Sequence, residues 1–326
     1  MKPSVCVIGG ATWDVLFTTS QADLVTPPGK AEQPVLAFPY GGKVDAQNVV
    51  YGFGGGAANV AVALARLGVR TQIVTRLGKD WRGDEVQRNL HQAGVNVDTI
   101  QRDARATTPL AFIVTAGGAH DHVAFVSRGA ALNISLPSRV PQSCRWLYVT
   151  ALAVPGWYSN LRRLFILAGQ RDQSIFWNPG SVQLQQPASI RKLLKHVTVF
   201  DINDDEGRLL AGKFRLKARR PPDLARAFAA AGARGVLITC GRAGAYFFDG
   251  HKIFFRPACP VKPVNTTGAG DAFGSGWLAG YLSSGGSVRE AMDWGMYNAS
   301  SVIMQAGAQR GILNLRGIAS FRRKYG

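Results

Sequence analysis

Short apolar runs recur along this chain, each ending at glycine or at a polar residue, and segments with helical periodicity separate them. The runs have the length and the β-branched and aromatic content of buried strands; they cover residues 5–8, 71–75, 146–149, 174–177, 197–200 and 236–240. Regular alternation of strand and helix favours a mostly parallel sheet, because parallel neighbours need a helical crossover. The sequence therefore predicts a doubly wound α/β fold with helices on both faces of one central sheet.

Two segments interrupt this alternation, and both are rich in proline and glycine. Residues 17–53 show little helical period but contain a short extended piece at 34–38. In the second, 108–131, two apolar runs flank a turn that contains Gly117 and Gly118, which predicts a β-hairpin. We expect both segments to form small β excursions from a single domain that spans residues 1–326.

A run of small residues near the C-terminal end precedes a carboxylate. Gly268, Ala269 and Gly270 free the backbone to turn sharply, and Phe273, Trp277 and Tyr281 follow at helical spacing. Unpaired amides at a helix start suit a phosphate-sized anion, and the helix dipole favours the ionised form of Asp271. Amides that hold an anion beside a proton acceptor are what phosphoryl transfer to an alcohol requires. A helix start with an aspartate in its first turn, and no ligand, is the alternative.

A second glycine-rich turn, Gly54-Gly55-Gly56, leads through Asn59 into a predicted helix that stops at Gly68. Earlier in the chain, Asp14 is predicted to lie just past the C-terminal end of the first strand, where open α/β sheets bind ligands. The turn before Asp14 lacks the G-x-G-x-x-G pattern of dinucleotide-binding folds. No P-loop motif is present either, which excludes P-loop NTPases.

The segment Asn265–Asp271 resembles the D-T-x-G-A-G-D signature of the PfkB (ribokinase-like) carbohydrate kinase family, and 54–59 resembles the family's N-terminal G-G-x-x-x-N signature. The resemblance implies a ribokinase-like fold whose two excursions form a β-sheet lid. It also implies an ATP-dependent kinase that phosphorylates a hydroxyl of a small sugar. Asp271 would then be the base, with the amides of Gly268, Ala269 and Gly270 on the phosphoryl group, and the acceptor would be held by Asp14, Gly54, Gly55 and Asn59.

The resemblance extends to the nucleotide. Asn203 and Glu206 match the family's N-x-x-E motif, which acts on Mg²⁺ and phosphate, with the glutamate binding through water; Mg²⁺ needs few protein carboxylates. Residues 239–244 are similar to the family's T-x-G-x-x-G loop, which packs against the nucleotide. The resemblance implies that Thr239, Gly241 and Gly244 make this contact, and that Asn298 also lies on the nucleotide side of the site. Without the resemblance, an acidic helix start, a strand-ending turn and a surface asparagine would explain these residues.

Three features depart from the family or point elsewhere. Asn265 replaces the aspartate that helps most members to hold a monovalent cation, which argues against potassium activation. Residues 177–180 read Trp-Asn-Pro-Gly where many sugar kinases have D-P-N. His120 and His122 share a predicted strand face, but with no third ligand on that face we expect no metal there.

The formal net charge of +18 favours anionic partners such as nucleotides, phosphosugars or nucleic acid. The densest clusters are 213–220 and 322–324. Too few aromatic residues accompany them for a base-stacking surface, so we expect a solvated loop and tail and no nucleic acid. No apolar run approaches the roughly 20 residues of a membrane span, and the N-terminus shows no signal-peptide pattern, so a cytoplasmic protein is expected.

Two other functions remain open. One is a nucleoside or phosphosugar kinase of the same family, and the other is a nucleic-acid-binding protein on a degenerate kinase fold. The presence of Asp271, Asn203 and Glu206 argues against degeneracy. We also predict that the apolar sides of the lid can pair two subunits, since an isolated small sheet needs its face covered.

Overall fold

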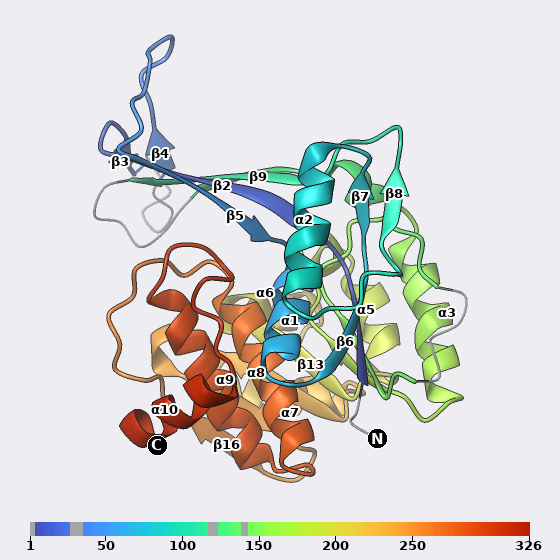
Figure 1. Cartoon of the computed structure of the whole chain (residues 1–326). Coiled ribbons are helices and arrows are strands. Elements are labelled where there is room, and N and C mark those ends of the chain that lie inside the picture. Colours follow the sequence, from blue (N-terminus) through green and yellow to red (C-terminus); the bar gives the residue numbers. More distant parts are fainter. Residues whose placement is uncertain (1–3, 27–34, 117–122, 138–142) are drawn as a thin grey trace.

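The computed structural model describes residues 4–26, 35–116, 123–137 and 143–326, and an eight-stranded sheet organises them (Figure 1). Its strand order is β16-β15-β14-β13-β12-β11-β1-β6. Six strands are parallel: β1 (Ser4–Ile8), β6 (Arg70–Val74), β11 (Trp146–Val149), β12 (Ser174–Trp177), β13 (Val199–Asn203) and β14 (Gly235–Thr239). At one edge, β15 (Ala245–Phe248) and β16 (Ile253–Arg256) run antiparallel.

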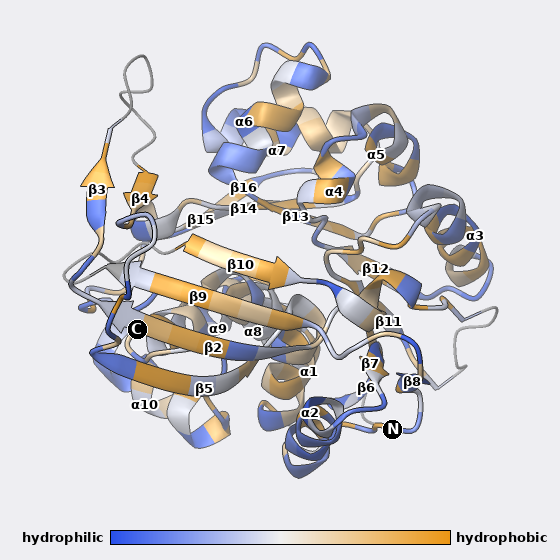
Figure 2. Cartoon of the chain, turned by 90° about the horizontal axis from the view of Figure 1, so that it is seen from above, coloured by the Kyte–Doolittle hydropathy of each residue, from blue (hydrophilic) through white to orange (hydrophobic). Residues whose placement is uncertain are grey.

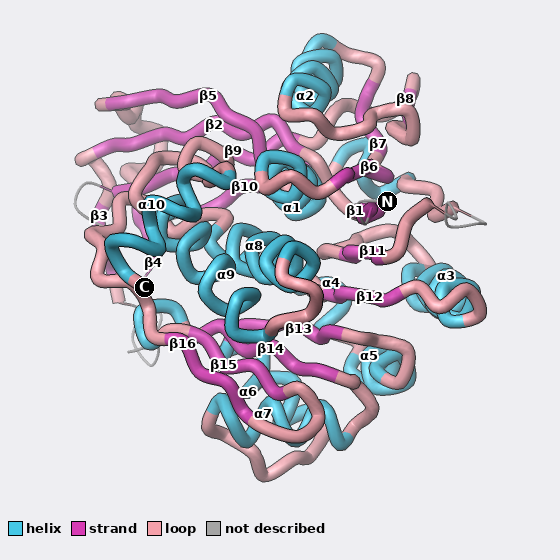
Figure 3. The backbone as a smooth tube through the Cα atoms, turned by 60° about the horizontal axis from the view of Figure 1, so that its bottom comes forward, coloured by secondary structure: helices cyan, strands magenta, loops and turns pink. Residues whose placement is uncertain are grey.

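Helices cover both faces of this sheet, as Figure 3 shows. One face packs against α1 (Gly56–Arg66), α8 (Ala269–Ser283) and α9 (Val288–Ile303), and the other against α3 (Trp157–Gly169), α5 (Pro187–Leu194), α6 (Asp204–Lys213) and α7 (Pro221–Ala230). Alternate side chains of one strand enter opposite cores: Tyr148 of β11 joins the first, and its neighbour Leu147 joins the second. The predicted doubly wound architecture is confirmed.

A second sheet, which we call the clasp sheet, lies over α1 and the C-terminal helices (Figure 1). It has the order β10-β9-β2-β5, formed by β2 (Thr12–Thr19), β5 (Asn48–Gly54), β9 (Leu110–Ala116) and β10 (Val123–Ser127). The predicted hairpin strands β9 and β10 do pair. A short ribbon of β3 (Asp23–Val25) and β4 (Val35–Ala37) extends from it. The predicted hairpin turn, with His120 and His122, lies outside the described residues.

The clasp sheet begins earlier in the chain than the predicted boundary at residue 17. Its strand β2 starts at Thr12, so Asp14 lies within a clasp strand and not in a turn past β1. The tight Gly9-Gly10 turn directly joins β1 to β2, which is why the sequence pattern suggested a strand end there.

The two faces of the clasp sheet differ in their surroundings. On the inner face, Leu16, Ala111 and Ile113 form a small buried cluster. On the outer face, Phe112 lies between the rings of Phe17 and Phe125, with centroids 5.5 and 6.4 Å away. Apolar residues colour much of β2, β9 and β10 in Figure 2. The clasp sheet thus has a buried apolar cluster on one side and an apolar surface on the other.

The described residues also include the short helix α4 (Ser181–Leu184), the paired strands β7 (Arg76–Gly78) and β8 (Gln101–Asp103), and two longer helices. Helix α2 (Trp81–Gln92) starts at Trp81 because the Asp80 side chain accepts a hydrogen bond from the Gly83 amide and caps the helix. The basic residues near the C-terminus belong to α10 (Leu315–Tyr325), where Arg322 pairs with Glu290. No helix among the described residues is long and apolar enough to cross a membrane.

Candidate active site

Helix α8 begins at a residue that only glycine suits. Gly268 caps the helix in the left-handed region, at a φ of 80°, and a β-carbon there would lie 2.6 Å from Cβ of Ala308. The turn therefore sits directly on the loop that follows α9. At the start of the helix the Ala269 amide donates to the Thr266 carbonyl over 3.2 Å, the Gly270 amide has no carbonyl one turn earlier within the helix, and Asp271 stands in the first turn.

Asp271 is held by a residue more than two hundred positions away. The Asn59 side chain on α1 donates from Nδ2 to Asp271 Oδ2 over 2.8 Å. Burial raises the pKa of Asp271 to about 6, and the Asn59 hydrogen bond lowers it in part. From the sequence, the dipole of this helix is expected to favour the ionised form of Asp271. Loss of water around the buried carboxylate outweighs that effect, so its pKa rises. The group is still mainly ionised at neutral pH.

Asn59 itself is almost fully buried and has a second partner. Gln309, in the loop after α9, donates from Nε2 to Asn59 Oδ1 over 3.0 Å. This contact favours a role for Asn59 in holding Asp271 over the predicted grip on acceptor hydroxyls. Gln309 was not singled out from the sequence, where only its place after Gly307 and Ala308 offered any signal.

Asp14 projects from β2 toward the start of α1. Its carboxylate is 4% exposed and accepts a 2.6 Å hydrogen bond from Thr12 Oγ1, while burial raises its pKa to about 6. A β-carbon on Gly54 would lie 1.9 Å from Asp14 Oδ2, so the first glycine of the signature makes room for this carboxylate. The structure thus brings Asp14 and Gly54 together beside α1, but Asp14 lines one cavity, with Arg66 and Gln309, whereas Gly55 lines another, at the start of α1.

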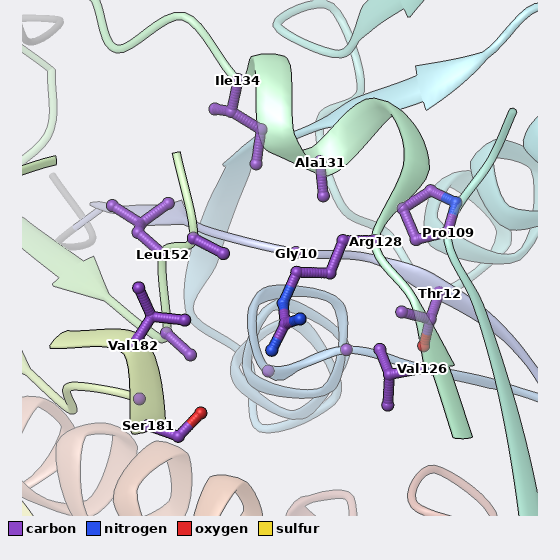
Figure 4. A pocket seen from close by; sticks show the side chains of 15 residues that line it. Gly10, Thr12, Pro109, Val126, Arg128, Ala131, Ile134, Leu152, Ser181 and Val182 are labelled. Atoms are coloured by element: carbon purple, nitrogen blue, oxygen red, sulfur yellow. The ribbon is translucent and has the colours of Figure 1, made fainter. Parts of the chain in front are cut away.

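A cavity of about 220 Å³ opens between the clasp sheet and the start of α1 (Figure 4). Gly55 and Gly56 line its floor, and a β-carbon on Gly56 would be 3.3 Å from Asp271 Oδ1, so the cavity reaches the predicted base. Apolar side chains form most of its wall: Pro109, Val126, Ala131, Ile134, Leu152 and Val182. Its size suits a small molecule.

Arg128 is the one charged residue among the described residues that line this cavity, and it was not anticipated from the sequence. Figure 4 shows its side chain extending from the segment after β10 to the middle of the cavity. No carboxylate pairs with its guanidinium among the ion pairs of the described residues. An unpaired cation therefore faces the space beside the predicted base.

The residues predicted to face the nucleotide lie at the carboxyl ends of neighbouring strands. Asn203 ends β13 and pairs in register with Thr239, which ends β14. Asn203 also forms a reciprocal cap with Glu206: Asn203 Oδ1 accepts from the Glu206 amide over 2.8 Å, and the Asn203 amide donates to Glu206 Oε2 over 3.1 Å. Gly241 starts a short 3₁₀ turn shortly after β14 and Gly244 follows its end.

A buried carboxylate that the sequence analysis assigned no role lies next to this motif. Asp201 of β13 is 2% exposed, and burial together with the charges of Glu206 and Asp271 raises its pKa. Burial likewise raises the pKa of Glu206. None of the three pairs with a basic residue among the described ion pairs. In the sequence, a single carboxylate among the apolar residues of this strand was the feature that could have indicated a functional residue.

Two predicted positions have local structural roles. Asn298 of α9 is fully buried; its Nδ2 donates to the Ala272 carbonyl over 2.8 Å and its Oδ1 accepts from the Leu313 amide over 3.0 Å. These hydrogen bonds favour a structural role for Asn298, which joins α9 to α8 and to the following loop, over the predicted contact with the nucleotide. Asn265 is buried as well, and its Oδ1 accepts from the Thr267 amide over 3.0 Å.

Comparison with known proteins gives consistent matches. The model of the pfkB family of carbohydrate kinases matches residues 25–314. Ribokinase of Bacillus subtilis is 27% identical over 95% of this chain and 96% of its own. The 2-dehydro-3-deoxygluconokinase of the same organism is 27% identical over 90% and 93%. The solved nucleoside kinase of Methanocaldococcus jannaschii has a similar fold, with a TM-score of 0.80 and 20% identity over 100% of this chain and 99% of its own.

Proposed function

Because the chain belongs to the PfkB family of carbohydrate kinases, and is therefore a phosphotransferase, we propose that it transfers the γ-phosphoryl group of ATP to a hydroxyl of a small sugar or sugar-like acceptor. The observation that carries this proposal is Asp271, an otherwise unpaired carboxylate that lies in the first turn of α8 and next to a cavity. The acceptor occupies the cavity, and the nucleotide lies along the ends of β13 and β14.

In this reaction Asp271 accepts the proton of the acceptor hydroxyl as its oxygen bonds to phosphorus. An alcohol is too weak an acid to ionise first, so the proton leaves late. The amides of Gly268, Ala269 and Gly270 stabilise charge on the transferred group. Asp14 accepts a hydrogen bond from another acceptor hydroxyl and so orients the molecule.

The acidic residues near β13 fit a divalent cation. Among the described residues no group of three potential ligands converges, which suits Mg²⁺ because it keeps several waters and binds mainly through nucleotide phosphates. Burial and repulsion raise the pKa values of Asp201 and Glu206, and a nearby cation would relieve both effects. We assign Glu206 to Mg²⁺ through water; bound with ATP, the ion supplies charge neutralisation at the phosphates.

The proposal is tested with the purified protein, Mg²⁺-ATP and a panel of acceptors, scored by ADP release. The panel holds ribose, hexoses, ketohexoses, nucleosides, phosphosugars and 2-keto-3-deoxygluconate. We expect ADP release that depends on one acceptor class and disappears without Mg²⁺. A protein that binds RNA in a salt-dependent gel shift and releases no ADP with any acceptor would contradict the proposal.

Arg128 favours an acceptor that carries an anionic group, either a carboxylate or a phosphate. A guanidinium forms two parallel hydrogen bonds with such groups, and Arg128, although exposed to solvent, stands against a largely apolar cavity wall that offers an anion no other charged partner among the described residues. One relative, the 2-dehydro-3-deoxygluconokinase, is named for a sugar acid. Within the panel we therefore expect the sugar acid or a phosphosugar to be used in preference to neutral ribose.

Substitution of Arg128 separates the two kinds of acceptor. An Arg128→Gln variant loses a charge-assisted hydrogen bond worth about 1.5–3 kcal/mol, which corresponds to roughly 10- to 150-fold in kcat/KM for an anionic acceptor. Values for neutral acceptors should stay within about twofold. Equal losses for neutral and anionic acceptors would contradict this role, and Arg105→Gln, an arginine outside the cavity lining, serves as the matched control.

We further propose that the clasp sheet is the lid of the site and that its outer face joins two copies of this chain. The outer face presents a row of apolar side chains with Phe125 57% exposed and Tyr51 62% exposed. Burial of this row would stabilise a dimer. We expect light scattering to give twice the chain mass for the wild type and one chain mass for Phe125→Glu. Phe255→Glu, at an exposed phenylalanine on β16, should remain dimeric; a monomeric wild type would refute the proposal.

A further inference from the structure

Three side-chain amides form a chain of hydrogen bonds that ends at Asp271. Asn89 of α2 donates from Nδ2 to Gln309 Oε1 over 2.9 Å. Gln309 donates from Nε2 to Asn59 Oδ1 over 3.0 Å, and Asn59 donates from Nδ2 to Asp271 Oδ2 over 2.8 Å. The chain links α2, the loop after α9, α1 and α8, and its two inner amides are buried.

The charge at one end fixes the direction of every bond in the chain. An ionised carboxylate can only accept, so Asn59 must turn its NH₂ group toward Asp271. Its Oδ1 then faces Gln309, which must present its own NH₂ group and offer Oε1 to Asn89. If Asp271 takes up a proton, it can donate, and the reverse order of amides becomes equally allowed.

We propose that Gln309 is a positioning residue that, by donating to Asn59 Oδ1, keeps the Asn59 amide turned toward Asp271 and holds the carboxylate ionised. The inference rests on the proposed role of Asp271 as base. Without a donor at position 309, the Asn59 side chain can rotate by half a turn and present its oxygen to Asp271, which disfavours the charged form.

The position of Gln309 is itself well fixed. Arg66 of α1 donates to the Gln309 carbonyl over 3.1 Å, so both the backbone and the side chain of this residue are tied to neighbouring helices. The other ionisable groups whose charges interact with Asp271 are Asp201 on β13 and Tyr148 on β11. Among the described residues the side-chain hydrogen bonds of Gln309 go to Asn59 and Asn89 and to neither of these groups, so we expect their influence on Asp271 to be the same in wild type and in Gln309 variants.

The test is the pH dependence of kcat in Gln309→Glu and Gln309→Met, measured on the full chain with saturating ATP and whichever acceptor proves active. A glutamate carboxylate cannot donate to Asn59 and instead accepts from it; methionine removes the donor without adding a titratable group. We expect the acid limb of kcat to move up by about one pH unit in both variants. Near pH 6 this shift amounts to about a fivefold loss of kcat, with wild-type values restored above pH 8.

A matched control is Gln305→Glu, at an exposed glutamine four residues earlier in the same loop. Its pH profile should match that of the wild type, and titration of ATP itself is common to all variants. A loss of kcat that is equal at every pH, or an unmoved acid limb in Gln309→Met, would overturn the inference. If Asp271→Asn is inactive and the Gln309 profiles are unmoved, only this inference fails; an active Asp271→Asn refutes the proposed base itself.

Discussion

An Asp271→Asn variant is expected to lose on the order of 100-fold or more in kcat while its affinity for ATP stays nearly unchanged. The amide keeps the size of the side chain, the first turn of α8 and an oxygen that can accept from Asn59 Nδ2, but it cannot take up the acceptor's proton. The loss should therefore appear in the chemical step. Single-turnover ADP formation measures that step, and calorimetric titration measures ATP binding.

The pH dependence of the wild type adds a second readout of the same residue. Because burial raises the pKa of Asp271 to about 6, the carboxylate gains a proton as the pH falls through 6, and kcat should fall about tenfold per unit below that point. Asp98→Asn, at an exposed carboxylate in the turn after α2 and outside the predicted site, serves as the control and should behave as wild type. Wild-type turnover in Asp271→Asn would mean that another group accepts the proton.

Asp14→Ala should lower kcat/KM for the acceptor by roughly 10- to 150-fold, since a hydrogen bond to a charged group is worth about 1.5–3 kcal/mol. The Asp14 side chain is buried, accepts a hydrogen bond from Thr12 and lines a cavity of about 260 Å³, so its removal takes away a charged acceptor for a bound hydroxyl. The KM for ATP should change little, because the residues proposed to face the nucleotide lie at the ends of β13 and β14. Initial rates over a grid of both substrates separate the two effects.

Asp23→Ala provides the comparison for Asp14→Ala, since Asp23 is an exposed aspartate on the β3–β4 ribbon of the same sheet system. Its kinetic constants should equal those of the wild type. If the KM for the acceptor is unchanged in Asp14→Ala, Asp14 does not bind the acceptor, and its buried charge has no functional explanation.

The central sheet could be predicted because its strands are buried on both faces and read as continuous apolar runs. The same rule placed several ends wrongly: the run 236–240 included the partly exposed Cys240, but β14 ends at Thr239, and the run 197–200 stopped three residues before the end of β13 at Asn203. The clasp sheet was harder to delimit. Its strand β2 alternates between buried and partly exposed residues, so its start at Thr12 carried no apolar signal.

The site was predictable where its parts are contiguous in the chain and not where they meet only in space. The turn at Gly268 and the helix that carries Asp271 could be inferred from small residues and helical spacing. The contact between Asn59 and Gln309 joins positions 250 residues apart, and no local pattern indicates it. Arg128 follows a strand of the clasp sheet, where an arginine is common in a sequence. Only the position of the cavity in the structure identifies it as a candidate site residue.

The clasp sheet has a small apolar cluster of its own, separate from the two large cores on the faces of the main sheet. Its local opening should therefore require far less free energy than unfolding of the central sheet. Asp14 lies on this sheet and Arg128 directly follows its strand β10. Substitutions that change the choice of acceptor thus fall mainly on a part of the molecule that contributes little to global stability. Helix α8, which we propose binds the transferred phosphate, by contrast packs into the large core, so we expect acceptor preference to diverge among relatives while the phosphoryl-transfer residues stay constrained.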